Sequence, residues 1–496
     1  MICVSVMQES RKLALVDMLN AAPQCDLIEL RLDKFEKAPD IKELLGQKRK
    51  PILVSCRRPK DGGYWSGSEA ERLALLRQCI IDKADYVEIE HDVADQIRPF
   101  PGSQRVISYT NMQGVPENLG DLWDQMRQHH PDVIKLTTLA RTPEEAWPLV
   151  QIAARAATPT VIVGLGKPGI MLTVLGKKVG APWAYAALER GLEAYPGQVT
   201  VADLNDIYRY PEIQKNTRLI GVTGFGQREV ALLAMLNAGL AAAGLPARCL
   251  PLGLGSLGTF RKVMEAVKLA GVALEETAGV DAAALASTRE AAAEGTGAVD
   301  FLISKEDKTW MGHHLFVRAA LTALEEALAS KAGTAEKPLN GRVVLIIGAN
   351  ASARAAAFGV RKRGGMPILA ARDKELAQHL AGQFKCRFVP FEAIYSTTHD
   401  VLVVTSEESR GKSGEAAGLH PGLLRVGSVV LDVTHMPRWS PLALEAQARG
   451  CTVVSPRKVL LAVAASAIQV LTGQPADQAV LTAALERASG AAEEPS

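Results

Sequence analysis

The sequence predicts an α/β protein in which an N-terminal (β/α)8 TIM barrel precedes a two-lobed α/β region with a C-terminal Rossmann-like lobe. Three observations support this prediction. A length of 496 residues suggests three domains at about 150 residues each. Short β-branched runs alternate with longer helical patterns every 20 to 30 residues or so, roughly the spacing of parallel βα units. A second such series begins at Leu219, after the pattern loosens over 208–216.

Composition and charge exclude several classes of protein. Hydrophobic residues are 48% and charged residues 22%, which excludes global disorder. A net charge of +2 gives no electrostatic case for nucleic acid or an anionic membrane as a partner. The seven scattered cysteines form no CxxC pair, so we expect reduced thiols and no metal site. The absence of a long apolar run and of a secretory signal predicts a cytoplasmic protein.

The N-terminal two hundred residues hold eight candidate strands, and this number favours a compact barrel over a doubly wound sheet. In such a barrel the chemistry lies at the carboxyl ends of the strands. The candidate strands are Ile2–Met7, Leu27–Asp33, Ile52–Arg57, Tyr86–Glu90, Arg105–Thr110, Val133–Thr138, Thr160–Gly166 and Trp183–Leu188.

Lys135 stands in the middle of the sixth candidate strand, between apolar neighbours. A buried cation is unfavourable, so we expect a lowered pKa for this lysine. A neutral lysine amine can form a Schiff base with a carbonyl substrate. The alternative is a buried ion pair of Lys135 with Glu29 or Glu90 that carries no chemistry.

Several of these segments, in the same order and spacing, resemble type I 3-dehydroquinate dehydratase over residues 1 to about 212. The motifs that carry the resemblance are Ile2-Cys-Val-Ser-Val-Met, Glu29-Leu-Arg31-Leu-Asp33, Arg57-Arg-Pro-Lys-Asp-Gly-Gly63, Val133-Ile-Lys135-Leu-Thr-Thr and Pro196-Gly-Gln198. The resemblance implies that Lys135 forms an imine with the ketone of a cyclic hydroxy acid, without a cofactor. It also implies an acid at Asp61 and four substrate-binding residues. These four are Glu29, Arg31, Arg57 and Gln198.

Three positions depart from the pattern of that family. Thr110 stands where the family has its general acid/base histidine, and a threonine hydroxyl does not exchange protons near neutral pH as an imidazole does. Thr173 stands at the arginine that grips the substrate carboxylate, and Ala194 at a serine before the Pro-Gly-Gln turn. We predict that His91, on the strand beside Thr110, replaces the lost base. The alternative is that His91 caps a helix or binds a loop carbonyl.

The second half divides into residues 215–335, residues 336–475 and a last helix with an acidic tail over 476–496. Within it a polar linker is expected at 331–341. Strand and Ala-rich helical patterns cover the first lobe at Leu219–Gly224, Val230–Ala243, Ala247–Pro251, Phe260–Leu269 and Ala298–Ser304. The Rossmann-like lobe has candidate strands at Arg342–Gly348, Met366–Ala371, Val401–Thr405, Ser428–Asp432 and Cys451–Val454.

The strand–turn–helix unit of the Rossmann-like lobe keeps only the first glycine of a dinucleotide fingerprint, Gly348. Asn350 accepts a positive φ more readily than most residues, so the turn can still form. Its side chain and that of Ser352 crowd the place of a phosphate, although a helix N-terminus still offers an anion site.

Residues 218–475 resemble shikimate dehydrogenase, and a dehydratase–dehydrogenase fusion is a known bifunctional arrangement. The segments concerned are Gly221-Val-Thr-Gly, Gly297-Ala-Val-Asp, Gly341-Arg-Val-Val-Leu-Ile-Ile-Gly-Ala, Asp432-Val-Thr-His-Met-Pro and Leu471-Thr-Gly. The resemblance implies NADP, with Gly348 and Asn350 at the turn and Arg372 on the 2′-phosphate. The adjacent Asp373 would repel that phosphate.

The polar residues that would hold shikimate are replaced throughout. Gly226–Glu229 stands at the Ser-x-Ser turn, Thr277 at the catalytic lysine, Phe316 at the catalytic aspartate and Val463 at the late glutamine. We therefore expect no dehydrogenase activity. The pair His313-His314 is unsuited to a metal or to acid–base work, because adjacent residues on a helix point in different directions.

Three hypotheses follow from the sequence. The first is a dehydratase that uses a Lys135 Schiff base and carries an inactive dehydrogenase-like half. The second is a Schiff-base enzyme with another carbonyl substrate, and the third is a binding or scaffold protein without catalysis. The sequence predicts no particular oligomeric state.

Overall fold

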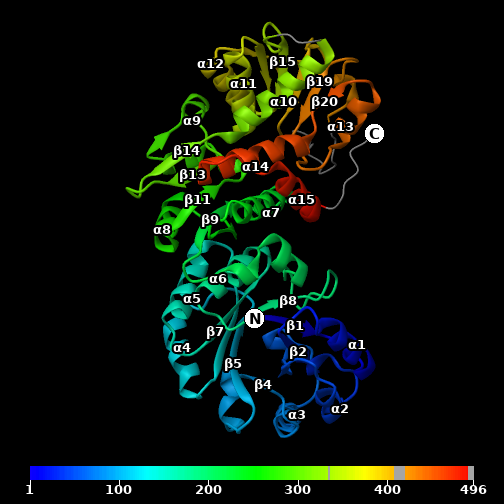
Figure 1. Cartoon of the computed structure of the whole chain (residues 1–496), viewed down its shortest axis with the longest axis vertical. Coiled ribbons are helices and arrows are strands. Elements are labelled where there is room, and N and C mark those ends of the chain that lie inside the picture. Colours follow the sequence, from blue (N-terminus) through cyan, green and yellow to red (C-terminus); the bar gives the residue numbers. More distant parts are fainter. Residues whose placement is uncertain (333–335, 407–418, 490–496) are drawn as a thin grey trace. The chain divides into compact units, whose positions relative to one another are not determined.

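The computed structural model describes residues 1–332, 336–406 and 419–489. The chain forms two compact units, Met1–Thr217 with Leu250–Ala266, and Arg218–Cys249 with Val267–Ser496. The first unit contains an eight-stranded sheet, and two six-stranded sheets account for the remaining strands (Figure 1). Within the described residues no helix is both long and apolar enough to cross a bilayer.

The eight-stranded sheet is entirely parallel and confirms the predicted barrel. Its order is β7-β6-β5-β4-β3-β2-β1-β8, and β7 and β8 also lie against each other, so the barrel is nearly closed. The strands are β1 (Ile2–Val6), β2 (Leu27–Arg31), β3 (Ile52–Ser55), β4 (Tyr86–Glu90), β5 (Gln104–Asn111), β6 (Val133–Leu139), β7 (Thr160–Leu165) and β8 (Ala184–Ala186).

Helices connect the strands on the outside of this barrel (Figure 1). The helix after β3 begins with a capping box, in which the Ser68 side chain accepts from the Glu71 N–H and Glu71 accepts from the Ser68 N–H. This box fixes the end of the polar loop that follows Arg57. The helices are α1 (Arg11–Ala21), α2 (Ile41–Gly46), α3 (Glu69–Ile81), α4 (Leu119–Gln128), α5 (Pro143–Arg155) and α6 (Ile170–Lys178).

The barrel interior is apolar at the amino ends of the strands and polar further along. Every second side chain of a strand points inward, so the layers follow from residue spacing. The lower, apolar cluster is Cys3, Leu27, Leu53, Val106, Val133, Val161, Val163, Trp183 and Tyr185. Two residues further along six of the strands lie the buried polar side chains of Ser5, Glu29, Ser55, Glu88, Ser108 and Lys135. The polar layer therefore lies next to an apolar layer of the barrel interior.

The remaining strands form two six-stranded sheets, β10-β9-β11-β13-β14-β12 and the parallel β17-β16-β15-β18-β19-β20. The second of these is the predicted Rossmann-like sheet. The strands are β9 (Arg218–Thr223), β10 (Ala247–Leu252), β11 (Leu269–Ala273), β12 (Thr288–Arg289), β13 (Phe301–Ser304), β14 (Trp310–His313), β15 (Val343–Ile347), β16 (Met366–Ala370), β17 (Arg387–Phe388), β18 (Val401–Val404), β19 (Val429–Asp432) and β20 (Thr452–Val453).

Helices α7 to α15 complete the second half. They are α7 (Gln227–Ala242), α8 (Leu257–Val267), α9 (Ala291–Thr296), α10 (Leu315–Ala332), α11 (Ala351–Lys362), α12 (Lys374–Gln383), α13 (Pro441–Ala448), α14 (Pro456–Thr472) and α15 (Gln478–Ser489). The predicted linker at 331–341 and the predicted tail lie partly outside the described residues, at 333–335 and 490–496.

Candidate active site

Lys135 lies on β6 inside the barrel, with 1% of its surface exposed. Its Nζ donates to Glu88 Oε2 at 2.7 Å and lies 3.8 Å from Glu29 Oε1. The ion pair expected from the sequence was with Glu29 or Glu90. The structure confirms the pair with Glu29 and adds Glu88 as the hydrogen-bonded partner, whereas Glu90 binds Arg72 from α3.

Burial lowers the pKa of Lys135, and the nearby Arg57 guanidinium lowers it further. The carboxylates of Glu88 and Glu29 raise the pKa of Lys135, but it stays below its ordinary value. A lowered pKa increases the fraction of neutral amine, which is the form that attacks a carbonyl carbon. The surroundings of Lys135 therefore favour nucleophilic chemistry.

Glu29 is the centre of a second set of contacts in the same layer. It accepts hydrogen bonds from Ser5 Oγ at 2.5 Å, Ser55 Oγ at 2.9 Å and Arg57 Nη2 at 2.5 Å. Burial would raise the pKa of Glu29, but Arg57, Lys135 and Arg31 outweigh it and hold the pKa well below its usual range. Glu29 is therefore a fixed anion beside Lys135.

The predicted binding residue Arg31 and the predicted acid Asp61 make their own ion pairs. Arg31 is fully buried, and its Nε and Nη2 donate to the two oxygens of Asp33 at 2.9 and 2.7 Å. Asp61 accepts from Arg58 Nε at 2.6 Å and so belongs to the outer part of the mouth. Neither residue has a direct hydrogen bond to Lys135 within the described part of the chain.

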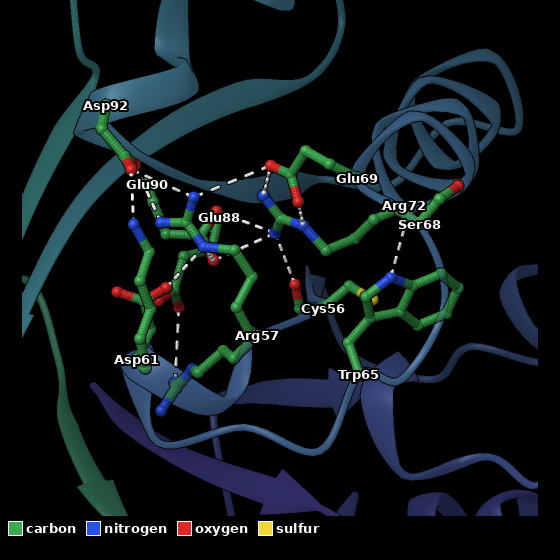
Figure 2. A network of polar contacts seen from close by, with 12 residues as sticks. Cys56, Arg57, Asp61, Trp65, Ser68, Glu69, Arg72, Glu88, Glu90 and Asp92 are labelled. Atoms are coloured by element: carbon green, nitrogen blue, oxygen red, sulfur yellow. Dashed lines mark hydrogen bonds and ion pairs between the residues drawn. The ribbon is translucent and has the colours of Figure 1, made fainter.

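A network of arginines and acids surrounds the ends of β3 and β4 (Figure 2). Arg72 reaches from α3 to the Cys56 carbonyl at 2.6 Å and to the carboxylates of Glu69 and Glu90. Arg58 binds both Asp61 and Asp92. This network fixes the ends of the two strands that carry Arg57 and Glu88.

His91, the predicted replacement base, lies beside an aromatic residue of β5. Its ring lies 5.6 Å from the ring of Tyr109, centroid to centroid. Tyr109 is on the face of β5 opposite to Thr110, because neighbouring side chains alternate and Ser108 pairs in register with the inward Lys135. His91 therefore contacts the outer face of β5.

Gln198 lies in the turn after β8, and its side chain is buried. Its Oε1 accepts from the Ala194 N–H at 2.6 Å. The turn packs against the loop after β7, where the Gly166 N–H donates to the Pro196 carbonyl at 2.9 Å. A Cβ on Gly197, whose φ is +83°, would lie 2.4 Å from the Gly166 carbonyl carbon, so only glycine fits there.

Several buried polar atoms of the barrel domain have no intramolecular hydrogen-bond partner within the described residues. Arg57 Nε, Thr137 Oγ1, Tyr185 Oη and Gln198 Nε2 are four of them. Nearly all buried polar groups in folded proteins are paired, so such a group requires a reason. A cavity that receives a polar ligand or ordered water provides one. Sequence reasoning missed Thr137, Tyr185 and the pairing role of Glu88. Strand alternation with Lys135 could have indicated Thr137, which lies two residues further along β6.

These features agree with the comparisons with known proteins. The model of the family Type I 3-dehydroquinase matches residues 2–215. The 3-dehydroquinate dehydratase of Methanopyrus kandleri is 31% identical over 185 residues, which are 36% of this chain and 84% of that protein.

The chain belongs to the type I 3-dehydroquinase family.

Two further similarities extend beyond this dehydroquinase domain. The "Bifunctional 3-dehydroquinate dehydratase/shikimate dehydrogenase, chloroplastic" of Arabidopsis thaliana is 25% identical over 497 residues, which cover 96% of this chain and 82% of that protein. The crystal structure of shikimate dehydrogenase from Aquifex aeolicus matches 54% of this chain and 97% of that one, with a TM-score of 0.47 and 22% identity. The similarity to the Arabidopsis protein thus continues past residue 215, where the match to the family model ends.

The amino end of α11 is where a nicotinamide dinucleotide would place its pyrophosphate. Here Asn350 Oδ1 accepts from the Ala353 N–H at 3.0 Å, and its Nδ2 donates to the Thr405 carbonyl at 2.7 Å. The Glu276 carboxylate accepts hydrogen bonds from the hydroxyl and the N–H of Ser352. The first turn is therefore occupied by the chain's own oxygens, one of them acidic, and does not fit a pyrophosphate.

The other predicted cofactor residues surround this turn. Gly348 has a φ of +124°, and a Cβ there would lie 2.3 Å from Thr405 Oγ1. Arg372 follows β16, and its guanidinium lies 4.6 Å from the centroid of the Phe391 ring. Asp373 caps α12 by accepting from the Leu376 N–H.

The histidine pair is not on a helix, contrary to the prediction. His313 ends β14 and His314 precedes α10. His313 Nδ1 lies 3.3 Å from Glu290 Oε2, and His314 Nδ1 lies 3.3 Å from Asp300 Oδ2. Across the described part of the chain, no group of three or more His, Cys, Asp and Glu residues is arranged to hold a metal ion.

Proposed function

We propose that the barrel dehydrates 3-dehydroquinate to 3-dehydroshikimate through a Schiff base on Lys135, with slow turnover. The observation that carries this proposal is the buried Lys135 amine between Glu88 and Glu29. Arg57 and Tyr185 lie close to it, and each has a buried polar atom with no intramolecular partner in the described residues. The family relationship supports the substrate, since the relatives that match this domain carry the name 3-dehydroquinate dehydratase.

The reaction begins with transfer of a proton from Lys135 to Glu88, which are 2.7 Å apart. The neutral amine then adds to the ketone, and loss of water leaves an iminium ion. Removal of the α-proton and departure of the β-hydroxyl release a second water, and hydrolysis of the imine consumes one. Net loss of one water gives the enone product.

Removal of the α-proton is the slow step of this proposal. Thr110 pairs in register with Thr137, two residues beyond the Ser108–Lys135 pair, and offers only a hydroxyl. His91 faces Tyr109, so the proposal assigns it no role. Water held near Thr110 and Thr137 then accepts the proton.

The test is reduction with borohydride in the presence of 3-dehydroquinate, using the full chain. We expect a mass increase that maps to Lys135, together with slow growth of enone absorbance. Lys135→Ala removes the adduct, whereas Lys167→Ala, at an exposed lysine after β7, retains it. Absence of an adduct in the wild-type protein would contradict imine chemistry and favour a binding or scaffold role.

A second candidate function is imine chemistry on a carbonyl compound that has no carboxylate. The pairing of the mouth arginines favours it, because Arg31, Arg57 and Arg58 already bind carboxylates of the chain. Thr173, the position matched to the family's carboxylate-binding arginine, is a buried neutral residue on α6. An adduct without enone formation from 3-dehydroquinate, and a faster adduct with a neutral hydroxyketone, would support this candidate.

We propose no hydride transfer in the C-terminal half, because the amino end of α11 is occupied by Asn350 and Glu276. The proposal also places the protein in a reducing compartment, the cytoplasm. All seven cysteines are free thiols, and six of them are buried. Thiol titration of freshly isolated, denatured protein checks this expectation.

A further inference from the structure

Tyr185 is a buried tyrosine of the apolar cluster whose ring reaches the Lys135 amine of the polar layer. It lies on β8, where it is 3% exposed, and the Lys135 Nζ lies 4.5 Å from its ring centroid. Its hydroxyl has no hydrogen-bond partner in the described part of the chain. Among the described residues, Tyr185 is the aromatic residue whose ring faces the Lys135 amine.

The hydroxyl of Tyr185 is a proton donor at neutral pH. Burial raises its pKa well above the ordinary value, and the nearby Glu29, Cys3 and Glu88 add to this effect. Arg57 acts in the opposite direction without reversing it. The side chain therefore holds its proton until a stronger base forms beside it.

A purely structural role does not account for this hydroxyl. A phenylalanine would fill the same space and keep the ring against Lys135, whereas a buried hydroxyl without a partner is unfavourable. Tyr210 shows the same features elsewhere, with a buried, unpaired hydroxyl and a ring 5.1 Å from Lys177 Nζ. The difference is that the Tyr185 ring contacts the one amine in the polar layer.

We propose that Tyr185 is a further catalytic residue of the barrel, the general acid for imine formation at Lys135; this inference rests on the proposed function. When the amine has added to the ketone, the carbinolamine C–O bond breaks as its oxygen takes the phenolic proton. The nitrogen lone pair forms the C=N bond, and water leaves. The phenolate recovers its proton from the water that later hydrolyses the imine.

This assignment separates two acid–base tasks in the barrel. Glu88 takes the proton of the Lys135 ammonium, and Tyr185 gives a proton to the oxygen that must leave as water. Neither task is removal of the α-proton, which is left without a dedicated base. Tyr185 therefore affects imine formation and hydrolysis, and Thr110 limits the elimination.

The test compares Tyr185→Phe with Tyr210→Phe in the full chain. Wild-type and variant proteins are mixed with 3-dehydroquinate and quenched with borohydride at increasing times, and the intact mass gives the rate of adduct formation. We expect Tyr185→Phe to slow adduct formation by on the order of 10²-fold while the final yield stays the same, because general acid catalysis has about that effect. Tyr210→Phe should form the adduct at the wild-type rate.

The possible outcomes distinguish the two proposals. An adduct in the wild type that forms equally fast in Tyr185→Phe overturns the role of Tyr185 and leaves the imine intact. A wild-type protein that forms no adduct overturns both. A lower final yield with an unchanged rate constant indicates a packing role and also overturns the assignment.

Discussion

Buried polar groups of the barrel interior and of the amino end of α11 differ in their hydrogen bonding. In the barrel domain, atoms such as Arg57 Nε and Tyr185 Oη are buried and unpaired within the described residues. At α11, Asn350 and Glu276 bond to the first-turn N–H groups themselves. The barrel thus retains hydrogen-bonding capacity for a ligand, and the first turn of α11 has used its own.

The difference shows why residue identities alone are a poor guide to loss of function. Both regions lack residues that their resemblance to known families implies. The barrel nevertheless keeps a reactive amine and open donors, whereas the nucleotide turn is filled by new contacts. Restoring a lost residue should have a different effect at an open position than at one filled by new contacts. This difference can be measured.

The largest expected effect comes from restoring a base in the barrel. Thr110→His should raise the rate of 3-dehydroquinate dehydration by about 10²- to 10⁴-fold, the contribution of a positioned general base. The rate of enone formation measures this, with Thr110→Ala as the control. If Thr110→His left turnover unchanged while His91→Ala abolished it, His91 would be the base despite its contact with Tyr109.

The next effect concerns the stability of the arginine network. Arg72→Met leaves Glu90 buried beside Arg58 alone, so we expect a loss of about 3–5 kcal/mol in the free energy of unfolding. Lys60→Met, at an exposed pair with Asp92, should cost at most about 1 kcal/mol. Denaturant unfolding followed by circular dichroism provides both values. Equal losses would mean that the network contributes no more than a surface ion pair.

Binding of NADPH at α11 is expected to give a smaller effect. Its result could contradict the difference between α11 and the barrel described above. A ligand at 100 times its Kd stabilises a protein by about 2.7 kcal/mol, and we expect NADPH to give no such shift with the wild type. The double variant Asn350→Gly with Glu276→Ala frees the N–H groups of Ser352 and Ala353, so we expect measurable binding of NADPH. A wild-type protein that is stabilised by NADPH would show that α11 is open.

The smallest effect is a shift in pH dependence. Because the neutral amine reacts, the rate of borohydride trapping should rise with pH and level off above the lowered pKa of Lys135, below its ordinary value of 10.5. Glu88→Gln removes a carboxylate that raises this pKa, so the midpoint should move to lower pH. Arg57→Met removes a cation that lowers it, so the midpoint should move to higher pH. Shifts in the same direction would contradict these opposed influences.

Strand periodicity was sufficient to predict the barrel and the Rossmann-like sheet except for its two-residue edge strand β17. β4 begins and ends where the sequence predicted it, and the other barrel strands differ by a few residues at their ends. The first lobe of the second half was harder. β11, β12 and β14 were not predicted, because each is short and β11 follows α8 after a single residue, so the helical and strand patterns merge.

The candidate site was predicted in part, for a physical reason. Lys135 and Glu29 stood out because charge within a buried strand is unusual, and Arg57 because it follows the third strand at the barrel mouth. The roles assigned to them remain predictions. The choice between Glu88 and Glu90 as the partner of Lys135 depends on the stagger of β4 against β6, which spacing along one strand does not contain. Tyr185 was overlooked because an aromatic residue in a strand gives no signal until its neighbours are known.

The close approach of Gly197 to the backbone at Gly166 and Lys167 has a consequence for access to the barrel. With the Gly166–Pro196 hydrogen bond, it joins the turn that carries Gln198 to the loop after β7. A larger residue at 197 would separate these two segments, so we expect it to displace Gln198 as well. On the other side of the mouth the loop between Arg57 and Ser68 is held by side-chain ion pairs of Arg58 with Asp61 and Asp92, so we expect its stability to depend on salt.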